Sequence, residues 1–389
     1  MNIHQHSRPV GVTDSLDGLR GILAIWVVLS HVTQLVAGPG GLITRGGIAV
    51  DLFMLVSGFL MVWTVSSREA KEPIGEGSTW EKFFIRRILR IAPLYFLLLV
   101  PGYIFSGQIS EMFVDVYAAL GQSFIRPFRD CGPSTLYNVL LHLTFLFGLF
   151  PCTSSNNILP DWSLSLEMQF YAVFPLLFLL IVRWKGGSLL LAILGALIAG
   201  LSQHFISISG TSSGGAITYP QPSLLPLRIN CFVAGMTLAL LLWRQSRDLM
   251  LLVSVLVSVY FFQRLSFMAI STVLILMFLS RSNLWLRWEG GYSWPLRRIE
   301  EFLTAPPLRF LGDISFGIYL VHFLILLPTV ATLNEVVGFR VLSGNEKFIF
   351  VSLLILPSIL FVSWLLHRWI EKPMIDLGRA LTAANRSSK

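Results

Sequence analysis

Residues 15–34 read SLDGLRGILAIWVVLSHVTQ. The stretch is mostly apolar and about 20 residues long, which is the length of an α-helix that crosses the hydrocarbon core of a membrane. It also carries Asp17, Arg20 and His31, three titratable side chains in a setting where such groups are costly. The stretch therefore predicts a membrane-spanning helix with a functional face.

The composition of the whole chain agrees with a membrane protein. Of the 389 residues, 54% are hydrophobic and only 13% are charged, whereas soluble domains carry about 25% charged residues. This composition excludes a single soluble domain and intrinsic disorder. The apolar residues come in long runs rather than in alternation, which argues against an outer-membrane barrel.

We expect an all-α, polytopic transmembrane helical bundle of about ten spans, with the N- and C-termini in the cytoplasm. This arrangement puts most of the 29 Lys and Arg on the cytoplasmic side. Residues 136–150 form a shorter apolar stretch that could span, re-enter or lie at the interface, so that eleven spans are the alternative. The ten expected spans are 18–36, 48–66, 91–107, 167–182, 188–208, 226–243, 249–263, 266–280, 312–332 and 348–367.

The formal net charge of +8 fits the basic ends of membrane helices better than nucleic-acid binding, because no basic stripe is interleaved with exposed aromatic residues. The three cysteines show no metal-ligand spacing, and no metal is expected. Cys131 and Cys152 share one expected outer segment, where they could form a disulfide or remain thiols.

Arg20 and His31 share one face of the first expected helix. Their eleven-residue separation brings the side chains to within about 20° of each other and about 16 Å apart along the axis. Asp17 lies one turn before Arg20 and could pair with it. An interfacial arginine and a helix-end histidine are the alternatives for each residue alone.

The segment FFIRRILR, residues 83–90, places Arg86 and Arg90 four residues apart on one helical face, with Arg87 pointing elsewhere. A lipid-binding basic flank is one interpretation. The other is a cytoplasmic clamp for a phosphate group, since the guanidinium fork matches phosphate oxygens.

Polar residues also mark the starts and faces of later helices. Asp51 and Glu167 lie near expected outer helix starts, where a carboxylate is favoured by the helix dipole, and desolvation would suit Glu167 to proton transfer. In GDISFGIYLVHFLIL, a polar stripe on an apolar helix consists of Ser315, Tyr319 and His322.

Six segments, in this order, resemble the acyltransferase-3 family of integral membrane O-acyltransferases: SLDGLRGILAIWVVLSH, AVDLFMLVSGFL, FFIRRILRIAPLYF, DWSLSLEMQFY, LGDISFGIYLVH and HRWIEKPM. Bacterial O-antigen and exopolysaccharide acetyltransferases belong to this family. The resemblance implies a single membrane acyltransferase domain at residues 1–376, followed by a polar cytoplasmic tail at 377–389.

The resemblance implies transfer of an acyl group, chiefly acetyl, from cytoplasmic acyl-CoA to a hydroxyl of a glycan acceptor. The family's Arg-x10-His pattern falls on Arg20 and His31, and its Arg-xxx-Arg pattern falls on Arg86 and Arg90. Many members read LEEQFY where this chain reads LEMQFY, so that Glu167 is the only carboxylate of the pair.

The catalytic residues expected from these patterns are His31, Arg20, Glu167 and Asp17. His31 would act as general base on the acceptor hydroxyl or would itself be acylated transiently, since an imidazole can do either. Glu167 or Asp17 would orient groups or relay protons.

The donor acetyl-CoA is expected to bind through Arg86 and Arg90, which would hold its phosphates, and through Arg20, which would guide the pantetheine arm. The residues expected to contact substrate are Tyr319, His322, Asp51 and Trp162.

The expected acceptor is a glycan or a lipid-linked glycan, with a small secondary metabolite or a lipid as the alternative. The expected location is the bacterial inner membrane, so that the lipid bilayer is a partner and nucleic acid is not. A transporter or flippase of glycan intermediates, or a structural partner of an export complex, could also have ten spans. Neither would need Arg20 and His31 on one face together with a basic clamp.

Overall fold

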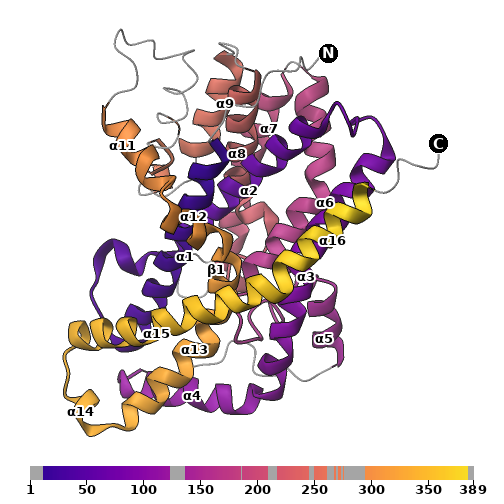
Figure 1. The fold of residues 1–389 in the computed structure, drawn as a ribbon. Coiled ribbons are helices and arrows are strands. Elements are labelled where there is room, and N and C mark those ends of the chain that lie inside the picture. Colours follow the sequence, from indigo (N-terminus) through magenta and orange to yellow (C-terminus); the bar gives the residue numbers. More distant parts are fainter. Residues whose placement is uncertain are drawn as a thin grey trace.

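The computed structural model describes residues 12–122, 136–184, 186–208, 217–244, 249–260, 267–268, 270–272, 275 and 294–383 (Figure 1). Its helices are α1 (Val12–Val36), α2 (Gly46–Arg68), α3 (Gly77–Ile104), α4 (Ser106–Ala119), α5 (Leu136–Leu143), α6 (Trp162–Arg183), α7 (Gly187–Phe205), α8 (Ile229–Arg244), α9 (Leu249–Tyr260), α11 (Trp294–Leu303), α12 (Pro306–Asp313), α13 (Ser315–Glu335), α14 (Val337–Arg340), α15 (Gly344–Leu366) and α16 (Lys372–Ala383). A π-helical turn, His367–Glu371, joins α15 to α16, and the two helices follow one another as a long rod in Figure 1.

The part of the chain that the structure describes is almost entirely helical, as expected. The described strands form a two-stranded parallel sheet of β1 (Ile206–Ile208) and β2 (Ile217–Tyr219), with Ile206 opposite Ile217.

Within the described residues, six helices are long and apolar enough to cross a membrane: α1, α2, α6, α7, α13 and α15 with its continuation α16. A seventh span results if α3 and α4, which bend by 74° at their junction, form one broken span. These helices support an integral membrane protein but do not confirm the expected ten spans. One reason is that α8, at 16 residues, measures only about 24 Å. Another is that the expected span at 266–280 lies largely outside the described residues.

The short apolar stretch at 136–150 does not form a long helix. Its helix α5 ends at Leu143 after 8 residues, a length of about 12 Å that is too short to cross the hydrocarbon core. A 3-10 turn, Phe147–Leu149, follows it.

Glycines allow the central helices to approach closely. A Cβ on Gly235 of α8 would lie 1.9 Å from the Leu55 carbonyl oxygen of α2, and a Cβ on Gly58 would lie 2.2 Å from the Phe232 carbonyl oxygen. The α2–α8 contact is therefore made backbone to backbone, as small residues permit in membrane helices.

The cytoplasmic tail expected at 377–389 begins as ordered helix. Residues 377–383 continue α16, which packs on α3 because Gly378 leaves room for Leu89, 3.4 Å from where its Cβ would lie.

Of the cysteines, Cys231 is buried in α8, and Cys152 is bonded in a disulfide. Cys131, the partner expected from sequence, lies outside the described residues.

An ion pair connects the loop after α2 to α3. Arg86 Nη1 and Nη2 donate to the two carboxylate oxygens of Glu72 at 2.9 and 2.7 Å, and Arg68 lies 3.4 Å from the same carboxylate. Burial by itself would raise the pKa of Glu72, but the hydrogen bonds and charge of Arg86, with the charge of Arg68, outweigh burial and hold the pKa below its usual value.

The close α2–α8 contact makes a first prediction. We expect Gly235→Ala to lower the stability of the protein by about 3 kcal/mol, because the added methyl group must push two backbones apart. Thermal unfolding in detergent measures the loss. Gly195→Ala in α7 is the matched control, since its Cβ would meet nothing closer than 3.6 Å. Equal stability of the two variants would contradict the close contact.

The Glu72 ion pair predicts a pH dependence. We expect Glu72→Gln to lower the melting temperature at neutral pH, where the carboxylate is ionised. The difference in melting temperature between wild type and Glu72→Gln should shrink as the pH falls below about 4.5, the ordinary pKa of a glutamate. The wild-type carboxylate loses its charge, and with it the ion pair, as the pH falls through its lowered pKa in the folded protein. Glu81→Gln, at an exposed position of α3, is the control. A difference that stays constant into acid would rule out the charge as its source.

Candidate active site

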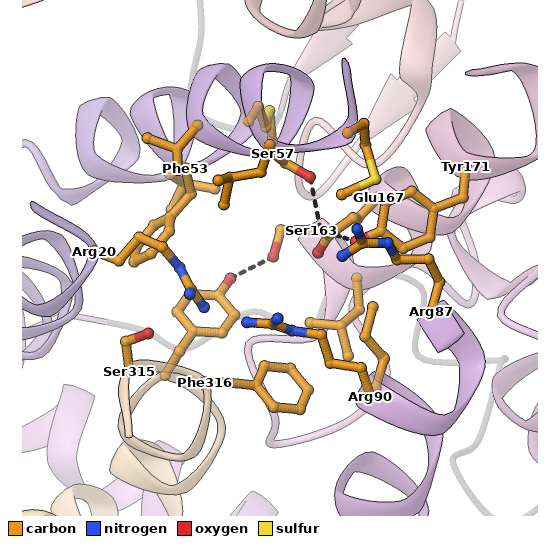
Figure 2. A pocket seen from close by; sticks show the side chains of 18 of the residues that line it. Arg20, Phe53, Ser57, Arg87, Arg90, Ser163, Glu167, Tyr171, Ser315 and Phe316 are labelled. Atoms are coloured by element: carbon orange, nitrogen blue, oxygen red, sulfur yellow. Dashed lines mark hydrogen bonds between the residues drawn. The ribbon is translucent and has the colours of Figure 1, made fainter. Parts of the chain in front are cut away.

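A cavity of about 110 Å³ lies between α1, α2, α3, α6, α8 and α13. Its walls are mainly apolar, and its polar side chains come from five of these helices (Figure 2). The lining residues are Arg20, Val50, Phe53, Met54, Val56, Ser57, Leu60, Met61, Arg87, Arg90, Ile91, Ser163, Leu164, Glu167, Tyr171, Phe232, Ser315, Phe316 and Tyr319. We refer to it below as the central pocket.

The central pocket carries more positive than negative charge. Its lining includes three guanidinium groups, Arg20, Arg87 and Arg90, and one carboxylate, Glu167. Figure 2 shows Arg20 and Arg90 reaching toward each other from opposite walls. Cations held close together in an apolar surrounding repel one another unless an anion joins them, so the pocket suits a negatively charged ligand.

Glu167 is held on α6 by two hydroxyl groups. Ser57 of α2 donates to its Oε1 at 2.9 Å, and Tyr171, one turn further along α6, donates to the same oxygen. These bonds fix the carboxylate in the pocket wall. Met168, which replaces the second acid of the family pattern, instead packs against the hydrophobic core.

Arg20 lies in the pocket wall with Asp17 behind it. Arg20 Nη1 is 3.5 Å from Asp17 Oδ1, the i, i+3 pair that the sequence predicted. Asp17 itself does not line the pocket. Asp17 therefore stabilises Arg20 and does not contact a ligand in the pocket.

The predicted pair Arg86 and Arg90 is divided by the structure. Arg90 lines the central pocket, whereas Arg86 does not and binds Glu72 instead. The expectation that Arg87 points elsewhere is wrong, because Arg87 lines the pocket. Residues three and four apart both lie near one helical face, so the spacing alone could not decide which of the two accompanies Arg90.

Arg87 is held by aromatic rings rather than by a carboxylate pair. Its guanidinium carbon lies 5.7 Å from the ring centre of Phe83 and 5.9 Å from that of Tyr171, distances typical of a cation–π contact. Its Nε is buried and has no hydrogen-bond partner among the described residues. No local pattern in the sequence pointed to this residue.

Tyr319 closes the pocket on the α13 side. Its hydroxyl lies 2.7 Å from the Ser163 hydroxyl of α6, which joins two helices that are far apart in sequence. Phe53 lies against it, with ring centres 6.3 Å apart. The sequence predicted Tyr319 as a substrate contact, and the structure places it in the lining.

His31 and His322 form a pair beside the central pocket. His322 Nε2 lies 3.0 Å from His31 Nδ1, and the two rings are within 18° of parallel. Neither ring lines the pocket, although the sequence predicted His322, like Tyr319, as a substrate contact. Tyr319 connects the two features, since it lines the pocket and its ring centre is 6.2 Å from that of His322.

Two other predicted substrate contacts lie elsewhere. Asp51 is buried and accepts a hydrogen bond of 2.8 Å from Arg228 Nε, which ties α2 to the turn before α8. Trp162 is the first residue of α6 and packs against the hydrophobic core. Neither lines the central pocket.

The described residues contain no group of three or more His, Cys, Asp and Glu that could hold a metal ion. The chemistry on offer in this region is that of guanidinium groups, one carboxylate, hydroxyl groups and the imidazole pair. Such a set can bind an anion and move a proton.

Comparison with known proteins agrees with this chemistry. A family model described as an acyltransferase domain matches residues 13–368. The chain is 24% identical to the "Peptidoglycan O-acetyltransferase OatA" of Listeria monocytogenes over 94% of this chain, but spans only 56% of that protein. No solved structure matches this chain.

Two further relatives are matched over most of their length. The "Exopolysaccharide production protein ExoZ" of Rhizobium meliloti is 28% identical over 87% of this chain and 92% of its own length. The "Acyltransferase MdmB" of Streptomyces mycarofaciens is 23% identical over 93% and 92%. The family match includes every helix that lines the central pocket, and the protein is accordingly a membrane acyltransferase of the acyltransferase-3 family.

Proposed function

We propose that the protein transfers an acyl group, in the first place acetyl, from cytoplasmic acyl-CoA to a hydroxyl of a glycan acceptor. The observation that carries the proposal is the central pocket, in which Arg20, Arg87 and Arg90 face a single carboxylate, Glu167. Acyl-CoA is a donor with several phosphate groups and a long flexible arm, and guanidinium groups bind phosphate oxygens through charge-assisted hydrogen bonds.

The donor would enter from the cytoplasmic side with its phosphates at Arg90 and Arg87. Arg20 would contact the arm, and His31 lies three turns further along the same face of α1, about 16 Å away. A pantetheine arm is of comparable length. Arg86, which is already bound to Glu72, would position α3 rather than touch the donor.

In the transfer step, His31 Nε2 takes the proton of the acceptor hydroxyl while the hydroxyl oxygen attacks the thioester carbonyl. The carbon–sulfur bond breaks, and the CoA thiolate takes the proton back from His31. Products are the acyl ester and CoA thiol. In the other course, Nε2 attacks the thioester carbonyl, the carbon–sulfur bond breaks and CoA leaves as the thiolate. The acceptor hydroxyl oxygen then attacks the acyl group on Nε2, the bond to His31 breaks, and the hydroxyl proton goes to the CoA thiolate.

The acceptor class is proposed from the relatives. The names of two of them refer to peptidoglycan and to exopolysaccharide. A glycan or a lipid-linked glycan at a bacterial cytoplasmic membrane is therefore the acceptor we propose.

We expect His31→Ala to reduce transfer by at least about 10²-fold, because it removes the group that moves the proton. The measurement is release of CoA thiol from acetyl-CoA by purified protein with mixed glycan acceptors. His204→Ala, at the exposed end of α7, is the matched control and should retain activity. Turnover that survives in His31→Ala would discard the mechanism, and absence of turnover in wild type would discard the donor.

The three neighbouring arginines of α3 should behave differently. We expect Arg87→Gln and Arg90→Gln to raise the KM for acetyl-CoA by about 10- to 100-fold, the value of one or two lost charge-assisted bonds. Arg86→Gln should chiefly lower the melting temperature, because it breaks the pair with Glu72. The arrangement would be contradicted if Arg86→Gln raised the KM more than Arg87→Gln did.

A further inference from the structure

We propose that His322 is a positioning residue that fixes the tautomer of His31, so that His31 Nε2 carries the lone pair used in the reaction. The inference rests on the proposed function, in which His31 is the base or the acyl carrier. It is carried by a row of three groups: the Tyr319 carbonyl, the His322 ring and the His31 ring.

The first link is between backbone and ring. His322 Nδ1 lies 2.7 Å from the Tyr319 carbonyl oxygen and 3.3 Å from that of Ile318. A carbonyl oxygen can only accept a hydrogen bond, so the proton lies on Nδ1 of His322. This leaves Nε2 of a neutral ring as an acceptor.

The protonation of His322 follows from its surroundings. The ring is completely buried, and no ion pair in the described part of the chain joins it to a carboxylate. An imidazolium buried without a counter-ion is costly, so that the ring keeps one proton rather than two.

The second link joins the two rings. Since His322 Nε2 is an acceptor and lies 3.0 Å from His31 Nδ1, the proton between them belongs to His31 Nδ1. The Val27 carbonyl, one turn earlier on α1, is a further acceptor beside the His31 ring and favours the same proton position. The near-parallel rings, with centres 5.0 Å apart, are compatible with this bond. His31 Nε2 is then the nitrogen without a proton, ready to accept one or to attack a carbonyl carbon.

The arrangement also stabilises the reacting state. When His31 Nε2 gains a proton, the Nδ1–H bond to His322 becomes charge-assisted and strengthens. Phe323, whose ring centre lies 4.5 Å from that of His31, packs against the same ring and limits its rotation. His322 therefore acts through His31, without contacting the substrate.

Replacing His322 by glutamine or by asparagine, two amides of similar polarity and different length, distinguishes a positioning role from a structural one. The Oε1 of glutamine is three bonds from Cβ, like His322 Nε2, and can accept from His31 Nδ1–H. The amide of asparagine ends two bonds from Cβ, at the level of Nδ1, and cannot reach His31. We expect His322→Gln to keep a substantial part of kcat and His322→Asn to lose at least about 10-fold more, within the range a general base contributes, with the KM for acetyl-CoA unchanged in both.

His142 is the matched control for loss of a buried histidine. Its ring is also fully buried, and its Nδ1 lies 2.9 Å from the carbonyl oxygen four residues earlier, but its polar contacts are with Asn138 and Asp161. We expect His142→Gln and His142→Asn to have equal kcat. Equal kcat of His322→Gln and His322→Asn, with both folded by thermal unfolding, would overturn the proposal.

A second readout is independent of activity. Ring 15N chemical shifts of histidine-labelled protein, with the His31 signals identified by their loss in His31→Gln, should show a proton on Nδ1 of His31 in wild type. The Asn variant of His322 should show a mixture of tautomers. A wild-type His31 protonated on Nε2 would overturn the inference even if His31 proved essential. If wild type shows the expected tautomer but no turnover of acetyl-CoA, the proposed function is refuted instead.

Discussion

Three guanidinium groups beside a single carboxylate, inside a bundle of apolar helices, are the constraint on which the rest of this structure depends. Burying a charged group is costly in free energy unless it is paired with an opposite charge or makes another favourable contact. Here Arg20 has Asp17 at 3.5 Å, and Arg87 lies over two aromatic rings. Glu167 is held by hydroxyl groups and contributes the pocket's carboxylate. The remaining positive charge attracts an anionic ligand, which connects the geometry of the pocket to a phosphate-bearing donor.

The bundle keeps these groups in place by close helix packing. Gly58 and Gly235 let α2 and α8 touch through their backbones, and the Asp51–Arg228 pair ties the N-terminal ends of the same two helices. Groups held on rigid elements need little reorganisation when a ligand binds or a charge develops. The sequence suggested Asp51 as a substrate contact. In the structure its buried ion pair instead stabilises the helices that surround the pocket.

Much of the architecture could be predicted from hydropathy, because an apolar run of the right length has few alternatives to a membrane helix. The number of spans could not, since α8 is apolar but short and α3 continues into α4 through a sharp bend. Among the site residues, Arg20, Arg90, Glu167 and Tyr319 do line one pocket. These four residues meet because their helices pack together, and no local sequence pattern specifies which helices become neighbours.

The sequence by itself determined that the chain forms apolar membrane helices and that Arg20 and His31 share a face of the first of them, because helical periodicity is a local property. It also carried, in the order of its motifs, the acyltransferase family. Only the tertiary structure decided that Arg87 rather than Arg86 faces the pocket and that His31 meets His322 across 291 residues of sequence. The rotation of a helix about its own axis, and the neighbour it meets, are set by side-chain packing with distant segments rather than by the period of its own residues.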